Sequence, residues 1–157
     1  MNSLLMETLH FVFGKAPVAD FLSGTVRSDV VNLKLWRKVM FVFFWGVGTT
    51  GTTTITVEAS DDVTPTTTSA VPFRSRRVSS PDTAVASVAQ AAAGFVTTAG
   101  SNQIYIAEVD VEALLASGYN YVSAKAVESV DDPILGGILI IVGEPRATEE
   151  PPASIVT

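Results

Sequence analysis

The segment that most limits the fold of this chain is Thr52–Ala59, in which polar and apolar side chains alternate from Thr54 onward. Ile55, Val57 and Ala59 share one face of an extended backbone, while Thr54, Thr56 and Glu58 share the other. This period-two pattern is typical of a strand with one buried and one solvated face, which is common in antiparallel sheets. We therefore predict a β-strand over these residues.

A glycine-rich loop, Gly46–Gly51, precedes this strand and has the G-x-G-x-x-G spacing of dinucleotide-binding loops. A dinucleotide site needs a helix that begins at the loop, because the helix amides hold the pyrophosphate. Here a strand follows the loop, and no Gly-Lys-Ser/Thr sequence follows it to form a P-loop. We therefore predict a β-hairpin at Gly46–Gly51 and no cofactor.

The most apolar run of the chain is Val39–Gly48, which lies mid-chain behind Arg37 and Lys38. It has about half the length that a membrane-spanning helix needs, and its position does not fit a signal peptide. Its aromatic and branched residues favour a pleated sheet. We predict a strand buried on both faces and no membrane partner.

About eight short strands, separated by polar turns, account for the region from Thr25 to Val142. This spacing predicts an all-β fold, an antiparallel β-sandwich or jelly roll. We predict three parts: an N-terminal arm over residues 1–24, the sandwich over residues 25–142 and an extended tail over residues 143–157. Within the arm, Ser3–His10 fits either a short helix capped by Ser3 or an extended segment.

The composition excludes several classes of function. A chain of 157 residues fits a single domain. Ten basic residues against sixteen acidic ones give a net charge of −6, which argues against a nucleic-acid partner because phosphate binding depends on Lys and Arg. The absence of cysteine excludes disulfides, thiolate-zinc sites and thiol catalysis.

The candidate catalytic groups do not form a convincing active site. His10 is the only histidine, and it lies in a terminal segment without a scaffold to orient it. Glu108, Asp110 and Glu112 share one face of a predicted strand, where solvated carboxylates are the simpler interpretation. We therefore expect no catalytic residues and no enzymatic activity.

Two acidic pairs, Asp61–Asp62 and Asp131–Asp132, lie in predicted turns. Calcium prefers six to eight oxygen ligands, and two such turns brought together would supply some of them. Neither pair has the spacing of a calcium loop, and aspartate is a common turn residue. We therefore expect no metal site.

Three arginines stand out in this acidic chain: Arg74, Arg76 and Arg77. Arg74 and Arg76 share a face of the predicted strand Val71–Val78, where they suit carboxylates on a partner protein. Balancing acidic residues within the chain is the competing interpretation, and both remain open.

The stretches 39–62, 100–129 and 131–146 resemble small structural proteins encoded beside the head genes of tailed bacteriophages. The resemblance covers residues 18–146. It implies a jelly-roll capsid cement or decoration protein that stabilises neighbouring major capsid protein subunits, is made in the host cytoplasm and lies on the capsid surface of the virion. It carries no catalytic residues. The alternatives are a carbohydrate- or receptor-binding jelly roll and a head–tail or tail component.

We also expect contact residues and self-association. A dimer or trimer would bury the apolar Ile134–Val142 segment, which we expect to form a sheet edge that would otherwise favour aggregation. A carbohydrate site would need exposed aromatic side chains, and we expect the tryptophans and tyrosines of the strands to lie in the core instead. The candidate partner contacts are Leu4, Leu5, Phe11, Phe13, Arg74, Arg76, Arg77 and Ile155.

Overall fold

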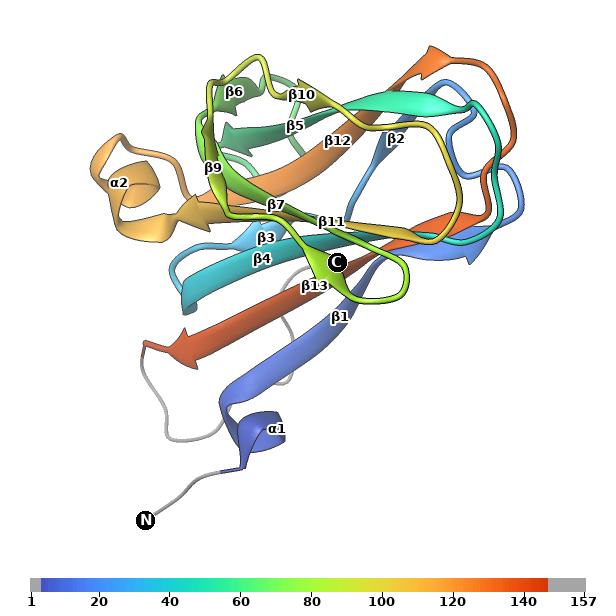
Figure 1. The fold of residues 1–157 in the computed structure, drawn as a ribbon. Coiled ribbons are helices and arrows are strands. Elements are labelled where there is room, and N and C mark those ends of the chain that lie inside the picture. Colours follow the sequence, from blue (N-terminus) through green and yellow to red (C-terminus); the bar gives the residue numbers. More distant parts are fainter. Residues whose placement is uncertain (1–3, 147–157) are drawn as a thin grey trace.

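The computed structural model describes residues 4–146 and shows two antiparallel sheets packed face to face (Figure 1). Sheet A contains, in spatial order, β1 (Leu9–Val18), β13 (Gly136–Pro145), β4 (Trp36–Trp45), β11 (Gln103–Asp110), β7 (Phe73–Ser79) and β8 (Thr83–Ala84), with β9 (Val88–Gln90) also paired to β7. Sheet B contains β10 (Phe95–Val96), β5 (Thr52–Ser60), β12 (Tyr121–Val130) and β2 (Thr25–Arg27), with β3 (Val31–Asn32) on β12 and β6 (Ser69–Val71) on β5. Two short helices, α1 (Leu5–Thr8) and α2 (Val111–Ala116), complete the described chain.

The strand order is that of a jelly roll. Eight strands follow this order, namely, along the chain, β1, β2, β4, β5, β10, β11, β12 and β13, and the remaining strands, β3 and β6 to β9, are inserted between them. Sheet A places the first beside the eighth, then the third and the sixth, and sheet B places the second, seventh, fourth and fifth side by side. This order is produced when a long antiparallel hairpin is wrapped into two sheets. The predicted all-β sandwich is therefore confirmed.

The core lies between the sheets and is filled by the inward rows of the long strands. On β4 these are Val39, Phe41, Phe43 and Trp45, and they meet Ile55 and Val57 of β5 within one buried cluster. The alternation predicted for Thr52–Ala59 is present in β5, where Ile55, Val57 and Ala59 are fully buried.

The predicted hairpin at Gly46–Gly51 is wrong, because β4 belongs to sheet A and β5 to sheet B. The loop instead carries the chain from one sheet to the other. Its glycines allow close packing: a Cβ at Gly48 would lie 2.5 Å from Cγ1 of Ile134, and one at Gly51 would lie 2.4 Å from the carbonyl oxygen of Asp132. The glycine spacing therefore serves packing at this crossing.

The expectation that the run containing β4 is buried on both faces is also wrong. Its inward residues have exposed fractions of 4% or less, whereas Met40, Val42 and Phe44, on the other face, are only partly buried. Sheet B covers one face of β4, and no described segment fully covers the opposite one.

The predicted boundaries change at both ends of the domain. Residues 9–18 of the expected N-terminal arm form β1 and pair with β13, so they belong to the sandwich. Gly14 and Pro17 suggested a break, but both lie in an edge strand, near its register shifts, where such residues are tolerated. β13 extends to Pro145 and lies between β1 and β4, so Ile134–Val142 contributes an internal strand and is not an edge. The rest of the predicted tail, residues 147–157, lies outside the described residues.

We predict that Phe41→Ala destabilises the fold much more than Phe44→Ala. Both side chains come from β4, but Phe41 is fully buried between the sheets and Phe44 faces outward. Removal of the Phe41 ring leaves a cavity and should cost about 3–5 kcal/mol of unfolding free energy, against about 1 kcal/mol for Phe44. Urea unfolding measures both values, and equal losses would contradict the assignment of the two faces.

Candidate protein-docking surface

The outward face of sheet A is apolar across four neighbouring strands. Strand alternation directs these side chains away from the core because their neighbours along each strand lie in the core or pack against it. We call this set the A face: Phe11, Phe13, Met40, Val42, Phe44, Ile104, Ile106, Leu139 and Ile141.

The strand register joins these side chains into continuous rows. Phe13 of β1 pairs with Leu139, Leu139 pairs with Val42, and Val42 pairs with Ile106. Directly paired side chains on one face of a sheet are in contact range. The row therefore crosses β1, β13, β4 and β11 without a polar residue. Exposure is greatest at the β1 end, where 71% of Phe13 and 52% of Phe11 is accessible.

Two arginines border the A face on β7. Arg76 pairs with Ile106 and Arg74 pairs with Glu108, so both arginines project from the outward face, as their spacing predicts. Arg74 donates a 2.9 Å hydrogen bond to the Ser87 hydroxyl. Among residues 4–146, neither arginine forms a salt bridge, although Glu108 lies directly opposite Arg74 in the register.

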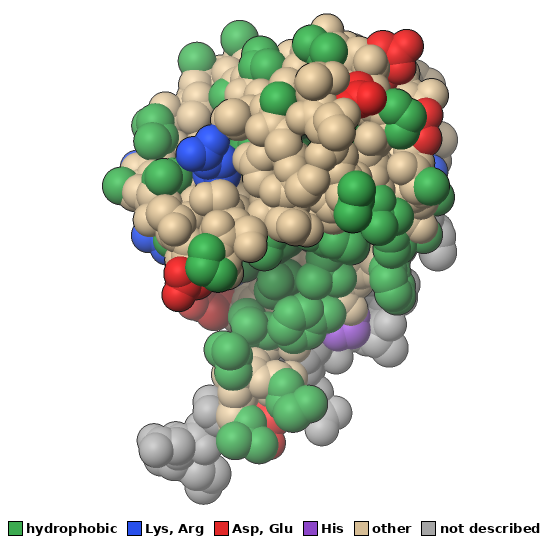
Figure 2. Space-filling model, turned by 45° about the vertical axis from the view of Figure 1, so that its right-hand side comes forward, with side chains coloured by type: hydrophobic (Ala, Val, Ile, Leu, Met, Phe, Trp, Pro, Cys, Tyr) green, Lys and Arg blue, Asp and Glu red, His purple; other side chains and the backbone are tan. Residues whose placement is uncertain are grey.

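The other predicted contact residues have different environments. Arg77 points to the opposite face of β7 and donates a 2.7 Å hydrogen bond to the Thr98 hydroxyl. Leu4 and Leu5 are 62% and 73% exposed, on a segment that projects from the body of the molecule (Figure 1). Figure 2 shows hydrophobic side chains gathered in the lower half of the molecule, from the body down to this segment. Ile155 lies outside the described residues.

The aromatic residues considered for a carbohydrate site are mostly in the core. Trp36, Trp45 and Tyr105 are at most 4% exposed, and Tyr119 and Tyr121 are half-buried. These five side chains therefore do not supply an exposed aromatic platform.

His10 also packs against the core. Its ring stacks on the buried Trp36, with the ring centroids 5.8 Å apart. β1 thus orients the imidazole against the core, which the sequence pattern does not indicate.

The three carboxylates predicted to share a strand face have separate environments. Asp110 ends β11 and caps α2, accepting a 3.1 Å hydrogen bond from the Ala113 amide. Glu112 lies in the first turn of α2 and accepts a 2.7 Å hydrogen bond from Arg146. Glu108 and Asp110 still share the outward side of β11, as predicted, and Glu112 alone has left the strand.

A shallow groove of about 490 Å³ adjoins the A face where β4, β11 and β7 meet α2. Charges of both signs line it, including Lys38 and Arg74 beside Glu108 and Asp110. Within residues 4–146, no three His, Asp or Glu side chains are grouped as metal ligands would be. The groove extends the polar border of the A face.

The Gly46–Gly51 loop binds a carboxylate of the chain itself. One oxygen of Asp132 accepts hydrogen bonds from the Thr50 amide at 2.7 Å, the Gly51 amide at 3.3 Å and the Thr49 hydroxyl. The hydrogen bonds from Thr49 and the two amides lower the pKa of Asp132 to about 2. Asp132, one of the aspartates considered as calcium ligands, therefore anchors the Gly46–Gly51 loop, which has the spacing of a dinucleotide-binding loop.

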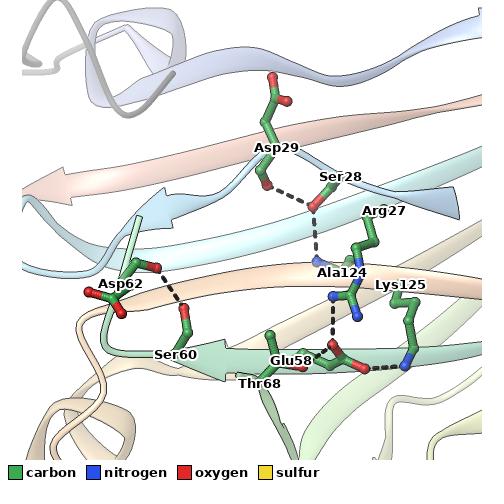
Figure 3. A network of polar contacts seen from close by, with 9 residues as sticks. All are labelled: Arg27, Ser28, Asp29, Glu58, Ser60, Asp62, Thr68, Ala124 and Lys125. Carbon is green, nitrogen blue, oxygen red and sulfur yellow. Dashed lines mark hydrogen bonds and ion pairs between the residues drawn. The ribbon is translucent and has the colours of Figure 1, made fainter. Parts of the chain in front are cut away.

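The outward face of sheet B carries a charged cluster centred on Glu58 (Figure 3). Its carboxylate is 5% exposed, lies 2.6 Å from Arg27, contacts Lys125 and accepts a 2.6 Å hydrogen bond from Thr68. Burial alone would raise the pKa of Glu58, but hydrogen bonds from Lys125, Thr68 and Arg27 outweigh burial and lower the pKa to about 2. The sequence pattern had suggested a simple solvated glutamate.

We predict that this cluster makes stability depend on acid pH. The folded pKa of Glu58 is lower than the unfolded value of 4.5, so its stabilising contribution is complete above pH 4.5 and is lost as the pH falls towards 2. The loss should be on the order of 2–3 kcal/mol. Glu58→Gln should remove this part of the pH dependence in urea unfolding, and Glu108→Gln should keep it. An unchanged profile in Glu58→Gln would contradict the assignment.

No helix within residues 4–146 has the length and hydrophobicity required to cross a membrane. No protein-family model matches the sequence, and no curated protein matches it. Among solved structures, the chain is similar to the SPBc2 prophage-derived protein YomS, with a TM-score of 0.43 and 11% identity over 87% of this chain and 93% of that one. It is also similar to a chain of the infectious bursal disease virus Gx strain, with a TM-score of 0.40 and 12% identity over 85% of this chain and 32% of that one. These likenesses concern the arrangement of the strands alone.

Proposed function

We propose that this chain is a structural protein of a bacteriophage particle, a cement or decoration protein that docks its A face on the capsid shell. The partner surface is expected to have an apolar centre and carboxylates placed opposite Arg74 and Arg76. The resemblance to structural proteins of tailed bacteriophages suggests that the chain belongs to a virus particle. The A face supplies the surface by which it would attach to the shell. The protein would join the outer surface of the shell after its synthesis in the host cytoplasm.

The observation that carries this proposal is the uncovered A face. With strands about 4.8 Å apart and outward residues about 7 Å apart along each strand, the face measures on the order of 400 Å². The largest apolar patch on a typical monomer measures about 300–600 Å² and is often functional, so a face of this size fits an interaction site. No segment within residues 4–146 fully covers the rows of β4, β13 and β11, and a partner surface would bury them.

The charges beside the A face favour an acidic partner surface. Arg74 and Arg76 form no salt bridge within the described chain, although the protein has sixteen acidic residues. Guanidinium groups bind carboxylates with directional, often paired hydrogen bonds. Such contacts at the border of an apolar interface would fix the orientation of the docked protein.

We propose no enzymatic role. Of the carboxylates considered for acid–base catalysis, Asp110 caps a helix and Glu112 binds Arg146. His10 packs on Trp36. These side chains have structural contacts that account for their positions, and docking requires neither catalysis nor a cofactor.

Rebinding to shells tests the proposal. Particles made without this gene should bind the purified chain in fixed stoichiometry and show a raised melting temperature. We predict that Arg76→Glu weakens rebinding at least tenfold, because it reverses the charge beside the A face. Lys34→Glu is the matched control, with the same charge change at an exposed turn away from that face, and it should rebind as the wild type does.

Two results would contradict this proposal. One is the absence of the chain from purified particles together with no rebinding to depleted shells. The other is equal rebinding of both charge variants, which would place the contact elsewhere on the surface. Specific binding to a glycan array, combined with either result, would favour the carbohydrate-binding alternative.

A further inference from the structure

The first strand leaves the only long unpaired edge in the part of the chain that the structure describes. β1 has ten residues and pairs on one side, with β13. The other peripheral strands, β2, β3, β6, β8, β9 and β10, have two or three residues each. Very short edge strands are a common protection against unwanted strand pairing, and β1 lacks that protection.

The exposed edge is confined to the first half of β1. Near Gly14 the edge is occupied, because the Asp29 amide donates a 2.8 Å hydrogen bond to the Gly14 carbonyl. Register shifts follow between Phe13 and Val18. The stretch Leu9–Phe13 has no proline, glycine, lysine or bulge to prevent pairing with another strand.

Several apolar side chains in this stretch and just before it are exposed to solvent. Phe11 and Phe13 are 52% and 71% exposed at the end of the apolar rows of the A face. Leu5 and Met6 of α1, immediately before the strand, are 73% and 75% exposed. An adjoining strand with apolar side chains would continue these rows.

We propose that the β1 strands of two copies of this chain pair antiparallel across a two-fold axis at Phe11. In this register Leu9 lies opposite Phe13 of the partner subunit, and His10 lies opposite Val12 of the partner subunit. Antiparallel pairing of one segment with its own copy satisfies two-fold symmetry, because each contact occurs twice. Apolar residues then face apolar residues on the A side of the joined sheet.

The residues on either side of the stretch are complementary in the same register. Glu7 precedes the stretch and Lys15 follows it, so pairing brings Glu7 of each copy towards Lys15 of the partner subunit. The exposed Leu4–Met6 segment is likewise brought towards the partner's Val18, which is 46% exposed. This complementarity of charge and hydrophobicity favours a second copy over an unrelated strand.

The pairing would join two A faces into one surface. A two-fold axis perpendicular to the sheet keeps both A faces on the same side, so a dimer would present a surface of twice the area. If the proposed docking is correct, two linked faces would bind a shell more tightly than a single face does. The pairing itself does not depend on that function and is tested with purified protein alone.

A single engineered cysteine tests the two-fold axis, because the chain has no cysteine of its own. Directly opposed residues in antiparallel strands have Cα atoms about 4.5–5.5 Å apart, within the range of a disulfide. We predict that oxidised Phe11→Cys forms a covalent dimer in most molecules. Val47→Cys, at an exposed position in the loop after β4, is the control and should remain largely uncoupled.

The register is tested by mixing two variants. Leu9→Cys mixed with Phe13→Cys should give the mixed disulfide in large excess over either homodimer, as read by mass spectrometry. Wild-type protein should sediment as a dimer at micromolar concentration, and Phe11→Lys should sediment as a monomer with an unchanged circular dichroism spectrum. A wild-type monomer at all concentrations, or a dimer without the Phe11→Cys crosslink, would overturn the proposal whatever the rebinding assay shows.

Discussion

A two-layer sandwich can cover only one face of each of its sheets, and sheet A is largely apolar on both faces across β1, β13, β4 and β11. Phe41 and Phe43 turn inward and pack against sheet B, whereas Val42 and Phe44 of the same strand turn outward and remain partly exposed. Sheet B is different, because its outward face carries threonines and the Glu58 cluster. This asymmetry is the reason for placing the binding surface on sheet A.

Some charged groups of the chain hold the fold, and two arginines border the proposed docking surface. Asp132 binds the loop that joins the two sheets. Glu58 binds the side chains of Arg27 and Lys125 on sheet B. Arg146, which follows β13, binds Glu112. Each of these contacts joins segments far apart in the sequence. Arg74 and Arg76 take no part in them, and they lie where an apolar interface would need an orienting polar border.

The sequence predicted those features of the fold that a short run of residues determines. The alternation around Ile55 and the polar turns between strands were sufficient for the β-sandwich. The sequence did not reveal that the Gly46–Gly51 loop crosses between sheets, because a crossing and a hairpin both use glycine. Nor could it show the burial of Glu58, which depends on the position of β12 beside β5. β1 was missed because Gly14 and Pro17 interrupt its pattern at an edge that tolerates them.

Hydroxyl-radical footprinting of the chain, free and in particles, tests most directly whether the A face is the binding surface. Met40, Phe44 and Ile106 lie within this face, and Val63 and Val85 are exposed outside it. In particles, labelling of the first group should fall several-fold while labelling of Val63 and Val85 stays unchanged. Equal labelling of Met40, Phe44 and Ile106 in the free and particle-bound states would contradict the account.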